Sequence, residues 1–556
     1  MSIFKQNSKN LKILPLGGIG TVTKNMYVYQ YGNEAIIVEC GVGFPEVEML
    51  GVDFVIPDIS YLRSNPNLKL HGIFITHGHD DHLGALPYIL PELKLPVFAT
   101  PITCALIEAR LDQTQKQNKF EINRVETGKT IQRGSFSVEF VRITHSVPQS
   151  ANFAIRTPAA TVYHASDFKF DFTPVDGSPP DIARIAQIGE EGVDLLMSDC
   201  LRAEKPGYTL TEKTLDDMFE REFQKSPKKI FVTTTSSNLS RVKQAIEIGA
   251  KFNRKPVLVG RSMEKAVNAG IKIGYFKDLK IIPVDKTRGI PPNQLLFLVA
   301  GSQGQVGSSL SQIANVEHQV SVEKDDTVIF SADPIPGNFD AVHNVIDSLT
   351  QLGARVLYSD ILDDLHVSGH AAANELLMMM GLLKPNYVMP ISGTPRHMKA
   401  YSNLAKSMGY PENRIILLEE GQTIEVSRDR VTLGERVESK NIMVDGIGVG
   451  DVGNVVLRDR KILSADGIVV VIVPIDHQTG QVVGEPDVVS RGFVYVNESK
   501  KLMHDTKQVV KNCLTQHQGN VTDWRFLRGK IEDNLERFLY NETKRHPMIL
   551  PVIIEV

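Results

Sequence analysis

One short stretch constrains this chain more than any other. Residues 74–86, FITHGHDDHLGAL, place three histidines and two aspartates within six positions, directly after an apolar run. Imidazole and carboxylate groups are ligands that suit Zn²⁺ or Mn²⁺. Crowded against a buried strand without a cation, such groups would repel one another or remain desolvated. The stretch therefore predicts that His77, His79, Asp81 and His82 bind metal, and their number favours two adjacent ions.

A site for two ions needs ligands from other parts of the chain. Two candidates follow later apolar segments: His145 in RITHSVP and Asp167 in HASDFKFD. An aspartate that bridges two ions holds them about 3.5–4 Å apart, an arrangement that serves hydrolysis of phosphoesters and amides. We therefore expect a hydrolytic centre at strand ends in which Asp167 bridges two divalent ions. Asp80, between the ligands, is expected to point toward solvent.

Composition excludes several protein classes. A chain of 556 residues with 42% hydrophobic residues can bury large cores, which predicts two to four domains. We expect no membrane partner, because no run of about 18 apolar residues occurs and the first residues lack a signal-peptide pattern. The four cysteines are scattered without CxxC spacing, which excludes a thiolate zinc site and fits a cytoplasmic location. Since the net charge is −4, a nucleic acid would have to be held in a local groove.

The spacing of apolar segments organises the chain. Short β-branched segments early in the sequence predict strands of a buried sheet: 36–40, 72–76, 138–144 and 161–166. From about residue 210, apolar strands alternate with helix-length segments, the pattern of a parallel α/β sheet. A Gly-rich, polar passage at 436–460 predicts a connection into a final module. The run VVVIVPI in that module predicts a buried strand.

Seven short motifs follow one another along the chain and link these segments: HxHxDH, THSVP, SDFKFDFTP, GSQG, PIPGN, HVSGHA and RGFVYV. Together they resemble the ribonuclease J family, from about Leu14 to the C-terminus. The resemblance implies an α/β fold, with a metallo-β-lactamase αββα sandwich, an inserted Rossmann-like β-CASP domain and a small α/β C-terminal domain. The boundaries that we expect are 1–208 for the first part of the metallo-β-lactamase domain, 209–361 for the β-CASP domain, 362–435 for the return, 436–460 for the linker and 461–556 for the C-terminal domain.

The resemblance also implies an activity. Family members are cytoplasmic ribonucleases that degrade single-stranded RNA 5′→3′ from a 5′-monophosphate, with endonuclease activity in many members, in RNA decay and rRNA maturation. They assemble as homodimers or homotetramers, or as hetero-oligomers with a paralogue. The implied cofactors are two divalent ions, in the first place Zn²⁺, with Mn²⁺ or Mg²⁺ as alternatives for activity.

Carried over by position, the resemblance gives each site residue a role. His77, His79 and His145 would hold one ion, Asp81 and His82 the other, and Asp167 would bridge them. His370 would protonate the leaving oxygen, with Asp199 orienting it. The implied catalytic residues are therefore Asp81, His370 and Asp199.

We expect loops of small residues to bind the RNA. Backbone N–H groups of such loops can cradle a phosphate, and the family's equivalent loops hold the RNA 5′-monophosphate. Further strand ends add candidate contacts to the RNA backbone. The residues expected to bind RNA or phosphate are Gly301, Ser302, Gln303, Gly304, His366, Ser368, Gly369, Ser236, Asn238, Arg241 and Arg261.

The sequence departs from the family pattern where the second ion should bind. In place of a histidine in PxHGE it has PISGTPRH, with Ser392 and Thr394, and serine is a poor ligand. His397 lies five residues further on, a large displacement for a metal–nitrogen bond. The other changes are Glu39 for an aspartate, Thr21 in the N-terminal loop and Gln305 after GSQG.

Three functions therefore stay open at the level of sequence. The first is a metal-dependent ribonuclease, favoured by the intact HxHxDH loop and His370. The second is a weakly active or inactive RNA-binding partner subunit, favoured by Ser392. The third is a lactamase-like or glyoxalase-like hydrolase of small molecules, which leaves residues 210–360 without a purpose.

Overall fold

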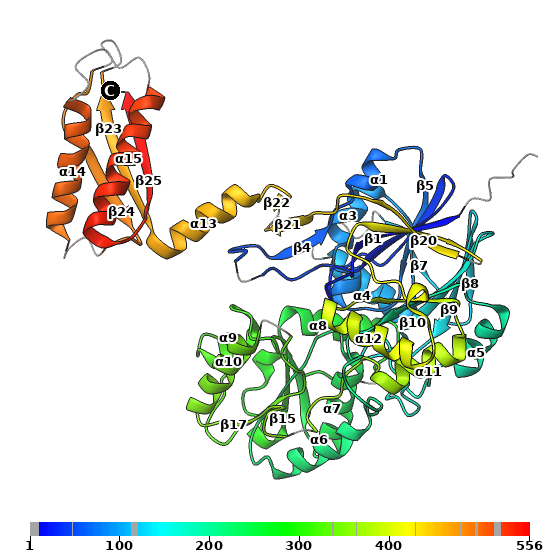
Figure 1. The fold of residues 1–556 in the computed structure, drawn as a ribbon. Coiled ribbons are helices and arrows are strands. Elements are labelled where there is room, and N and C mark those ends of the chain that lie inside the picture. The colour runs from blue at the N-terminus through cyan, green and yellow to red at the C-terminus, as the bar shows by residue number, and fades with distance from the viewer. Residues whose placement is uncertain are drawn as a thin grey trace, which may run out of the picture. The chain divides into compact units, whose positions relative to one another are not determined.

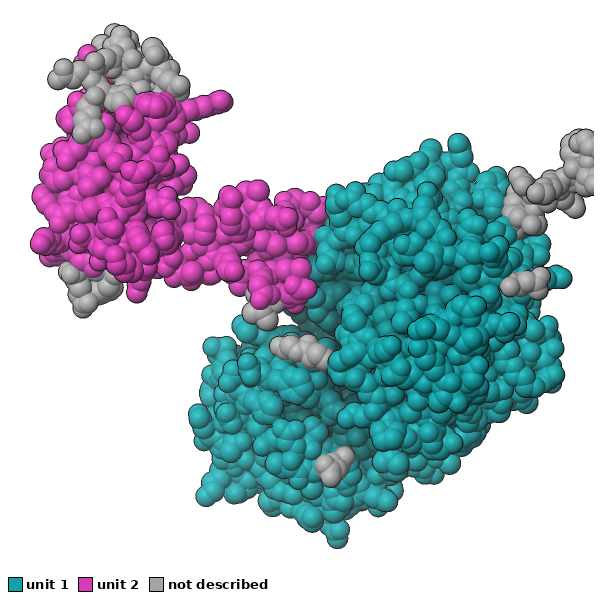
Figure 2. Space-filling view, in the orientation of Figure 1, with its two compact units in different colours: residues 1–44, 54–442 teal, residues 45–53, 443–556 magenta. Residues whose placement is uncertain are grey.

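The chain forms two compact units, coloured separately in Figure 2. Unit 1 comprises residues 1–44 and 54–442, and unit 2 comprises residues 45–53 and 443–556. The computed structural model describes residues 10–46, 48–112, 120–277, 279–335, 338–362, 364–428, 430–446, 448–476, 481–494, 499–515 and 524–555. The sequence did not indicate that residues 45–53 would join the C-terminal unit.

Two sheets packed face to face build the first part of unit 1 (Figure 1). Phe74 of one sheet lies against Phe140 and Phe153 of the other, with ring centroids 6.3 and 6.2 Å apart, in a shared core. The first sheet has the order β20 (Arg430–Arg436), β19 (Gln422–Ser427), β1 (Leu11–Gly17), β2 (Met26–Tyr31), β3 (Glu34–Val38), β5 (Lys69–Ile75), β6 (Val97–Ala99) and β7 (Ile122–Arg124). The second has the order β18 (Tyr387–Ile391), β12 (Leu195–Asp199), β11 (Thr161–Ala165), β10 (Ala151–Arg156), β9 (Phe136–Arg142) and β8 (Thr130–Arg133).

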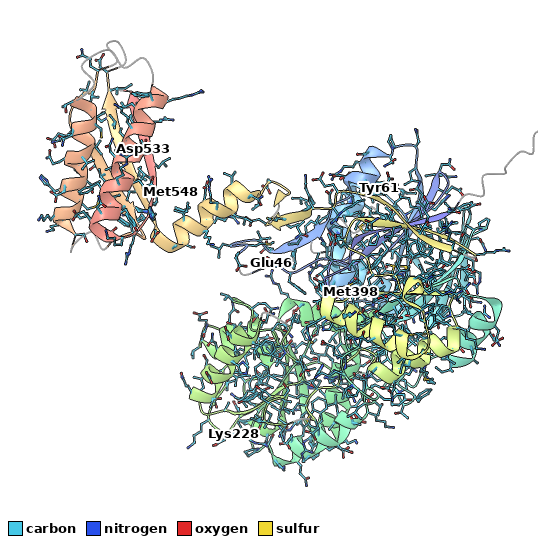
Figure 3. The ribbon with its side chains drawn as sticks, in the orientation of Figure 1. Glu46, Tyr61, Lys228, Met398, Asp533 and Met548 are labelled. Atoms are coloured by element: carbon cyan, nitrogen blue, oxygen red, sulfur yellow. The ribbon has the colours of Figure 1, made fainter. Side chains whose placement is uncertain are left out.

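Helices cover the outer faces of this sandwich. α4 contacts β6 and β7 of the first sheet, while α11 and α12 contact β12 and β18 of the second. Met398 of α12, labelled in Figure 3, is buried in the core beneath these helices. The helices in this part of the chain are α1 (Ser60–Ser64), α2 (Asp80–Leu83), α3 (Leu86–Leu93), α4 (Pro101–Asp112), α5 (Ile182–Glu191), α11 (Ala373–Leu383) and α12 (Pro395–Ser407). The short strand β4 (Phe54–Pro57) belongs to neither sheet of the sandwich.

A five-stranded parallel sheet forms the rest of unit 1, drawn in green in Figure 1. Its central strands are buried throughout, because helices cover both faces. The strand order is β14 (Lys255–Val259), β15 (Leu295–Val299), β13 (Ile230–Thr233), β16 (Thr327–Phe330) and β17 (Arg355–Leu357). The helices are α6 (Thr214–Lys225), α7 (Leu239–Lys251), α8 (Arg261–Lys272), α9 (Ser309–Ala314) and α10 (Phe339–Gln351). α8 packs against α4, which joins the two parts of unit 1.

Unit 2 is built on a three-stranded sheet of order β24 (Asp487–Arg491), β23 (Ile468–Ile475) and β25 (Met548–Glu555). Burial alternates strictly along β23, since α14 (Lys500–Thr515) and α15 (Trp524–Thr543) cover one face only. The passage expected as a linker contains regular structure, namely strands β21 (Asn441–Asp445) and β22 (Gly448–Val449) and the start of α13 (Asn454–Asp466).

The fold class expected from the sequence is confirmed: both sheets of the sandwich, the inserted parallel sheet and the C-terminal α/β module are present. Part of the PIPGN motif, residues 336–337, and the end of RGFVYV, residues 495–496, lie outside the described residues. No described helix combines the length and the hydropathy that crossing a membrane requires.

Candidate metal centre

The ends of three strands bring the predicted ligands together. His77 and His79 follow β5, His145 follows β9, and Asp167 follows β11. β9 and β11 both pair antiparallel with β10, so their C-terminal ends lie at the same edge of the sheet. One ligand atom from each of these four residues lies within 4.8 Å of the others.

The spacing of these atoms suits one ion. Nδ1 of His79 lies 3.1 Å from Nε2 of His77 and 3.1 Å from Nε2 of His145. Oδ2 of Asp167 lies 3.6 Å from His77 Nε2 and 3.8 Å from His145 Nε2. Ligands about 2.0–2.1 Å from a tetrahedral ion stand about 3.3–3.4 Å apart, so small shifts would close the set around Zn²⁺.

Neighbouring groups fix which nitrogen of each imidazole is available. His145 donates its Nδ1–H to the carbonyl of Gly369 at 2.7 Å, which leaves Nε2 as the ligand atom. Thr76 donates its hydroxyl to Glu39 and can therefore accept the Nδ1–H of His77 at 2.9 Å. These contacts hold both imidazoles in the tautomer that presents Nε2 to the centre.

Electrostatics also favour a cation here. Burial and the neighbouring histidines hold the pKa values of His77 and His145 well below the usual value, so both imidazoles are neutral and offer lone pairs. Burial alone would raise the pKa of Asp167, but His82 and His370 outweigh it and keep that carboxyl ionised. Its Oδ1 is buried without a hydrogen-bond partner, an orphaned acceptor that an ion would satisfy. The residues present therefore fit a divalent metal ion.

A second group shares Asp167. Nε2 of His82 lies 3.3 Å from Asp167 Oδ2 and 3.5 Å from Asp81 Oδ2, again ligand-to-ligand distances. Nδ1 of His82 faces Oε1 of Glu39 at 3.2 Å, so Nε2 is the nitrogen turned to the centre. The carboxylate of Glu39 thus supports His82 from the side away from the centre.

Ser392 and His397 do not complete the second group. The hydroxyl of Ser392 donates to Oδ1 of Asn25 at 2.9 Å. His397 caps α12, with Nδ1 3.1 Å from the hydroxyl of Thr394 and 3.3 Å from its backbone nitrogen. His397 is therefore committed to a helix end and does not replace the missing ligand.

His370 stands beside both groups. Its Nε2 lies 3.9 Å from Asp167 Oδ2, and its Nδ1 lies 2.8 Å from Asp199 Oδ2, at the end of β12. Burial acts to lower the pKa of His370, but the carboxylates of Asp199 and Asp167 outweigh it and raise the pKa to about 9. A protonated imidazole thus faces the centre at neutral pH.

The GSQG and HVSGH loops come close to each other through one intermediate. Gln303 donates to the carbonyl of Asp333 at 3.0 Å and accepts from the backbone of Ile335 at 2.7 Å. The carboxylate of Asp333 lies 3.8 Å from Nε2 of His366. Burial and the Arg241 charge lower the pKa of His366 to about 4, so this imidazole is neutral.

The small residues of these loops are needed where they stand. Gly301 and Gly304 have φ of 109° and 68°, which favour glycine. A Cβ on Gly369 would lie 2.5 Å from Cε1 of His145. The hydroxyl of Ser368 accepts from the backbone of His370 at 3.2 Å, and Ser302 is buried. Gly369 thus packs directly against a predicted metal ligand.

The remaining predicted contacts divide into buried and exposed residues. Arg241 does not reach a surface where it could meet RNA: it is fully buried and donates to Glu212, to Ser331 and to the carbonyl of Val367. Asn238 is buried too and caps α7. Arg261 is exposed at the start of α8, where Ser236 and Ser262 pair through their hydroxyls at 3.0 Å.

Three supporting residues escaped the sequence analysis: Asn25, Thr76 and Glu212. Asn25 touches His82, Thr76 orients Glu39 and His77, and Glu212 pairs with Arg241 and Lys169. Of these three, Thr76 alone could have been noticed in the sequence, because it directly precedes the first predicted ligand. The partners of Asn25 and Glu212 are distant in sequence and come close only in the folded chain.

Comparison with known proteins agrees with this geometry. Four family models match along the chain: "Metallo-beta-lactamase superfamily" at residues 19–212, "Ribonuclease J, beta-CASP domain" at 227–349, "Zn-dependent metallo-hydrolase RNA specificity domain" at 360–417 and "Ribonuclease J C-terminal domain" at 455–556. A solved structure titled "Crystal Structure of a Protein of Unknown Function from Enterococcus faecalis V583" shares the fold with a TM-score of 0.53 and 18% identity, covering 75% of this chain and 100% of that chain.

Two curated relatives extend over the whole length. Ribonuclease J2 of Bacillus subtilis (strain 168) is 37% identical over 557 residues, which is 99% of this chain and 100% of the relative. Ribonuclease J 2 of Staphylococcus aureus (strain NCTC 8325 / PS 47) is 37% identical over 562 residues, all of both chains. With its sandwich, its inserted sheet and its histidine–aspartate centre, the chain belongs to the ribonuclease J family.

Proposed function

We propose that this chain is a metal-dependent ribonuclease that degrades single-stranded RNA in the 5′→3′ direction from a 5′-monophosphate. The observation that carries the proposal is the histidine–aspartate cluster with His370 at its side, 3.9 Å from Asp167. Full-length similarity to the two ribonucleases favours an enzyme over an inactive partner subunit. The inserted sheet and C-terminal module, both matched by ribonuclease J models, disfavour a hydrolase of small molecules.

The protein's own groups divide the chemistry between them. A divalent ion held by His77, His79, His145 and Asp167 would supply Lewis-acid activation of water and of the scissile phosphate. Asp199 accepts the Nδ1–H of His370 and so keeps Nε2 directed at the centre. The side chain of His370 is 17% exposed, so its Nε2–H can reach a leaving oxygen and donate the proton. Asp81 and His82 would bind a second ion next to Asp167.

The preference for a 5′-monophosphate is assigned to the two small-residue loops. Gly301, Ser302, Gln303 and Gly304 would offer backbone N–H groups to the terminal phosphate, together with the loop of His366, Ser368 and Gly369. Support comes from the contact of these loops through Asp333, and from Gly369, whose carbonyl binds the ligand His145. Arg261 and Ser236 are the remaining candidates for contact with RNA. Arg241 and Asn238 are not, because their side chains are buried within the fold.

The domain limits and the assembly belong to the proposal as well. We assign residues 1–208 and 362–435 to the metallo-β-lactamase domain, 209–361 to the β-CASP domain and 461–556 to the C-terminal domain. In unit 2 the face of the sheet away from α14 and α15 is apolar, with Leu550 47% and Ile554 43% exposed, which supports homodimers or homotetramers through this surface. A cytoplasmic location is supported by the four free cysteines.

The test gives the purified chain a single-stranded RNA that carries either a 5′-monophosphate or a 5′-hydroxyl, with Mn²⁺, Mg²⁺ or Zn²⁺. Products are separated by length, and His79→Ala runs alongside to exclude a contaminating nuclease. We expect metal-dependent release of mononucleotides, faster from the 5′-monophosphate. RNA that binds but stays uncut with every metal would contradict the proposal and favour the partner-subunit function.

A further inference from the structure

The two ligand groups of this centre are not equivalent. The first has four protein ligands, three imidazoles and the Asp167 carboxylate. The second has three, Asp81, His82 and the shared Asp167, and the carboxamide of Asn25 lies beside it. Affinity of a site rises with the number of ligands that the protein supplies, so the two positions differ in how firmly they hold an ion.

The surroundings fix the orientation of the Asn25 carboxamide. Its nitrogen lies 3.1 Å from the carbonyl of Val22 and 3.2 Å from the carbonyl of Asp81, both of which can only accept hydrogen bonds. Its oxygen lies 2.9 Å from the Ser392 hydroxyl and 3.1 Å from the Tyr27 hydroxyl, both of which can donate. The side directed at the second group is therefore the NH₂.

That NH₂ lies against a metal ligand. Nδ2 of Asn25 is 3.3 Å from Nε2 of His82, the nitrogen turned to the centre. Both N–H groups face carbonyl acceptors, so the NH₂ adds no lone pair for a cation, and its partial positive charge opposes an ion close by. Asn25 is fully buried, and Ser392 supplies one of the two hydroxyls that hold its oxygen.

We propose that this chain keeps one resident ion, bound by His77, His79, His145 and Asp167, and takes up a second ion only reversibly. Asn25, positioned by Ser392 and Tyr27, holds a partially positive NH₂ beside His82, which opposes a second ion and supplies no ligand for it. The second position then follows the free metal concentration. This inference rests on the proposed function, because it concerns the same centre, but it is a statement about ion binding that can be tested without RNA.

The first experiment counts ions. The full chain, loaded with Mn²⁺ or with Zn²⁺ and then dialysed, is analysed for metal per chain, and Mn²⁺ is titrated back into it in a calorimeter. We expect one retained ion and a second binding event at least about 100-fold weaker. In Asp81→Asn, which alters the second group alone, the retained ion should persist and the weak event should vanish. In His145→Ala the retained ion should be lost.

An isosteric change then tests Asn25 itself. Asn25→Asp replaces the N–H donors with a carboxylate oxygen at the same place, so the second event should tighten at least tenfold. Ser392→Ala is the matched control, because it alters the same network without adding a ligand, and it should leave one ion retained after dialysis. Circular dichroism checks the fold of each variant.

Several outcomes would overturn the proposal: two ions retained by the dialysed chain, a weak event that survives Asp81→Asn, or a folded Asn25→Asp chain with unchanged affinity. If Asn25→Asp does not fold, the comparison of the unaltered chain with Asp81→Asn still decides. A chain that binds ions as proposed but never cuts RNA would leave this inference intact and refute the ribonuclease function, so the two failures are distinguishable.

Discussion

The proton on His370 is held in place by two carboxylates, and this sets the pH range in which the side chain can act as an acid. Burial opposes the charge, while Asp199 and Asp167 stabilise it and raise the pKa to about 9. The acid form is therefore present below that pH and is lost as pH rises through it. A cation bound to Asp167 weakens this stabilisation of the protonated imidazole. The decrease of kcat at high pH (the basic limb of its pH profile) should therefore have its midpoint at or below pH 9.

Asp199→Asn should move this limb to lower pH, because it removes the first of the two stabilising charges. The measurement is kcat against pH with saturating RNA, for the unaltered chain and for Asp199→Asn. His370→Ala is the reference and should lower kcat about 10²–10⁴-fold, with no limb from this group. An Asp199→Asn profile that coincides with that of the unaltered chain would argue against His370 as the acid.

Gly369 shows how close the loop proposed to bind phosphate comes to His145, a proposed metal ligand. A Cβ at this position would lie 2.5 Å from Cε1 and 2.6 Å from Nδ1 of His145. Gly369→Ala should therefore displace the imidazole and lower the amount of retained metal, while far-ultraviolet circular dichroism stays unchanged. The control is Gly381→Ala in α11, where the nearest atom is Met408 Cε at 3.8 Å. Equal metal content in the two variants would mean that the added methyl group displaces the loop and leaves the His145 imidazole in place.

Among the elements, α7 adds a second connection between the inserted sheet and the sandwich, besides the packing of α8 on α4. The guanidinium of Arg241, in α7, donates hydrogen bonds to Glu212, to Ser331 and to the carbonyl of Val367. Glu212 also pairs with Lys169 at 3.1 Å. Arg241→Met leaves the buried carboxylate of Glu212 with one cation instead of two. We expect the free energy of unfolding to fall by about 3 kcal/mol, measured with urea on the full chain.

Arg261→Met offers the matched comparison, because this arginine starts α8 and is exposed. Its stability should change by less than about 0.5 kcal/mol, while its affinity for single-stranded RNA should decrease, measured by fluorescence anisotropy. A large loss of stability in Arg261→Met, or none in Arg241→Met, would contradict the separation of the two arginines into an RNA contact and a structural support.

Residues of the centre could be predicted from the sequence when they follow a recognisable strand, and not when their role depends on partners distant in sequence. His77, His145 and Asp167 each follow an apolar strand within a few residues, so local pattern alone placed them at strand ends. The roles of Arg241 and Asn25 depend on partners 29 and 57 residues away, and a single sequence carries no signal for such pairs. The passage at 436–460 was expected as a plain connection because glycine and polar residues dominate it, yet tertiary packing gives it two strands and the start of a helix.

For the whole molecule, the proposed assembly turns on the open sheet face of unit 2. Val470 and Leu550 share this face in register, as do Ile472 and Val552, while the alternate residues of β23 are buried under α14 and α15. An apolar surface of this kind on an exposed sheet indicates association with another chain. Leu550→Glu should therefore shift the chain toward monomers, as measured by light scattering coupled to gel filtration. Val483→Glu is the control, since Val483 is similarly exposed, at 45%, but lies outside these strands. An unchanged mass for Leu550→Glu at micromolar concentration would exclude this face as the interface.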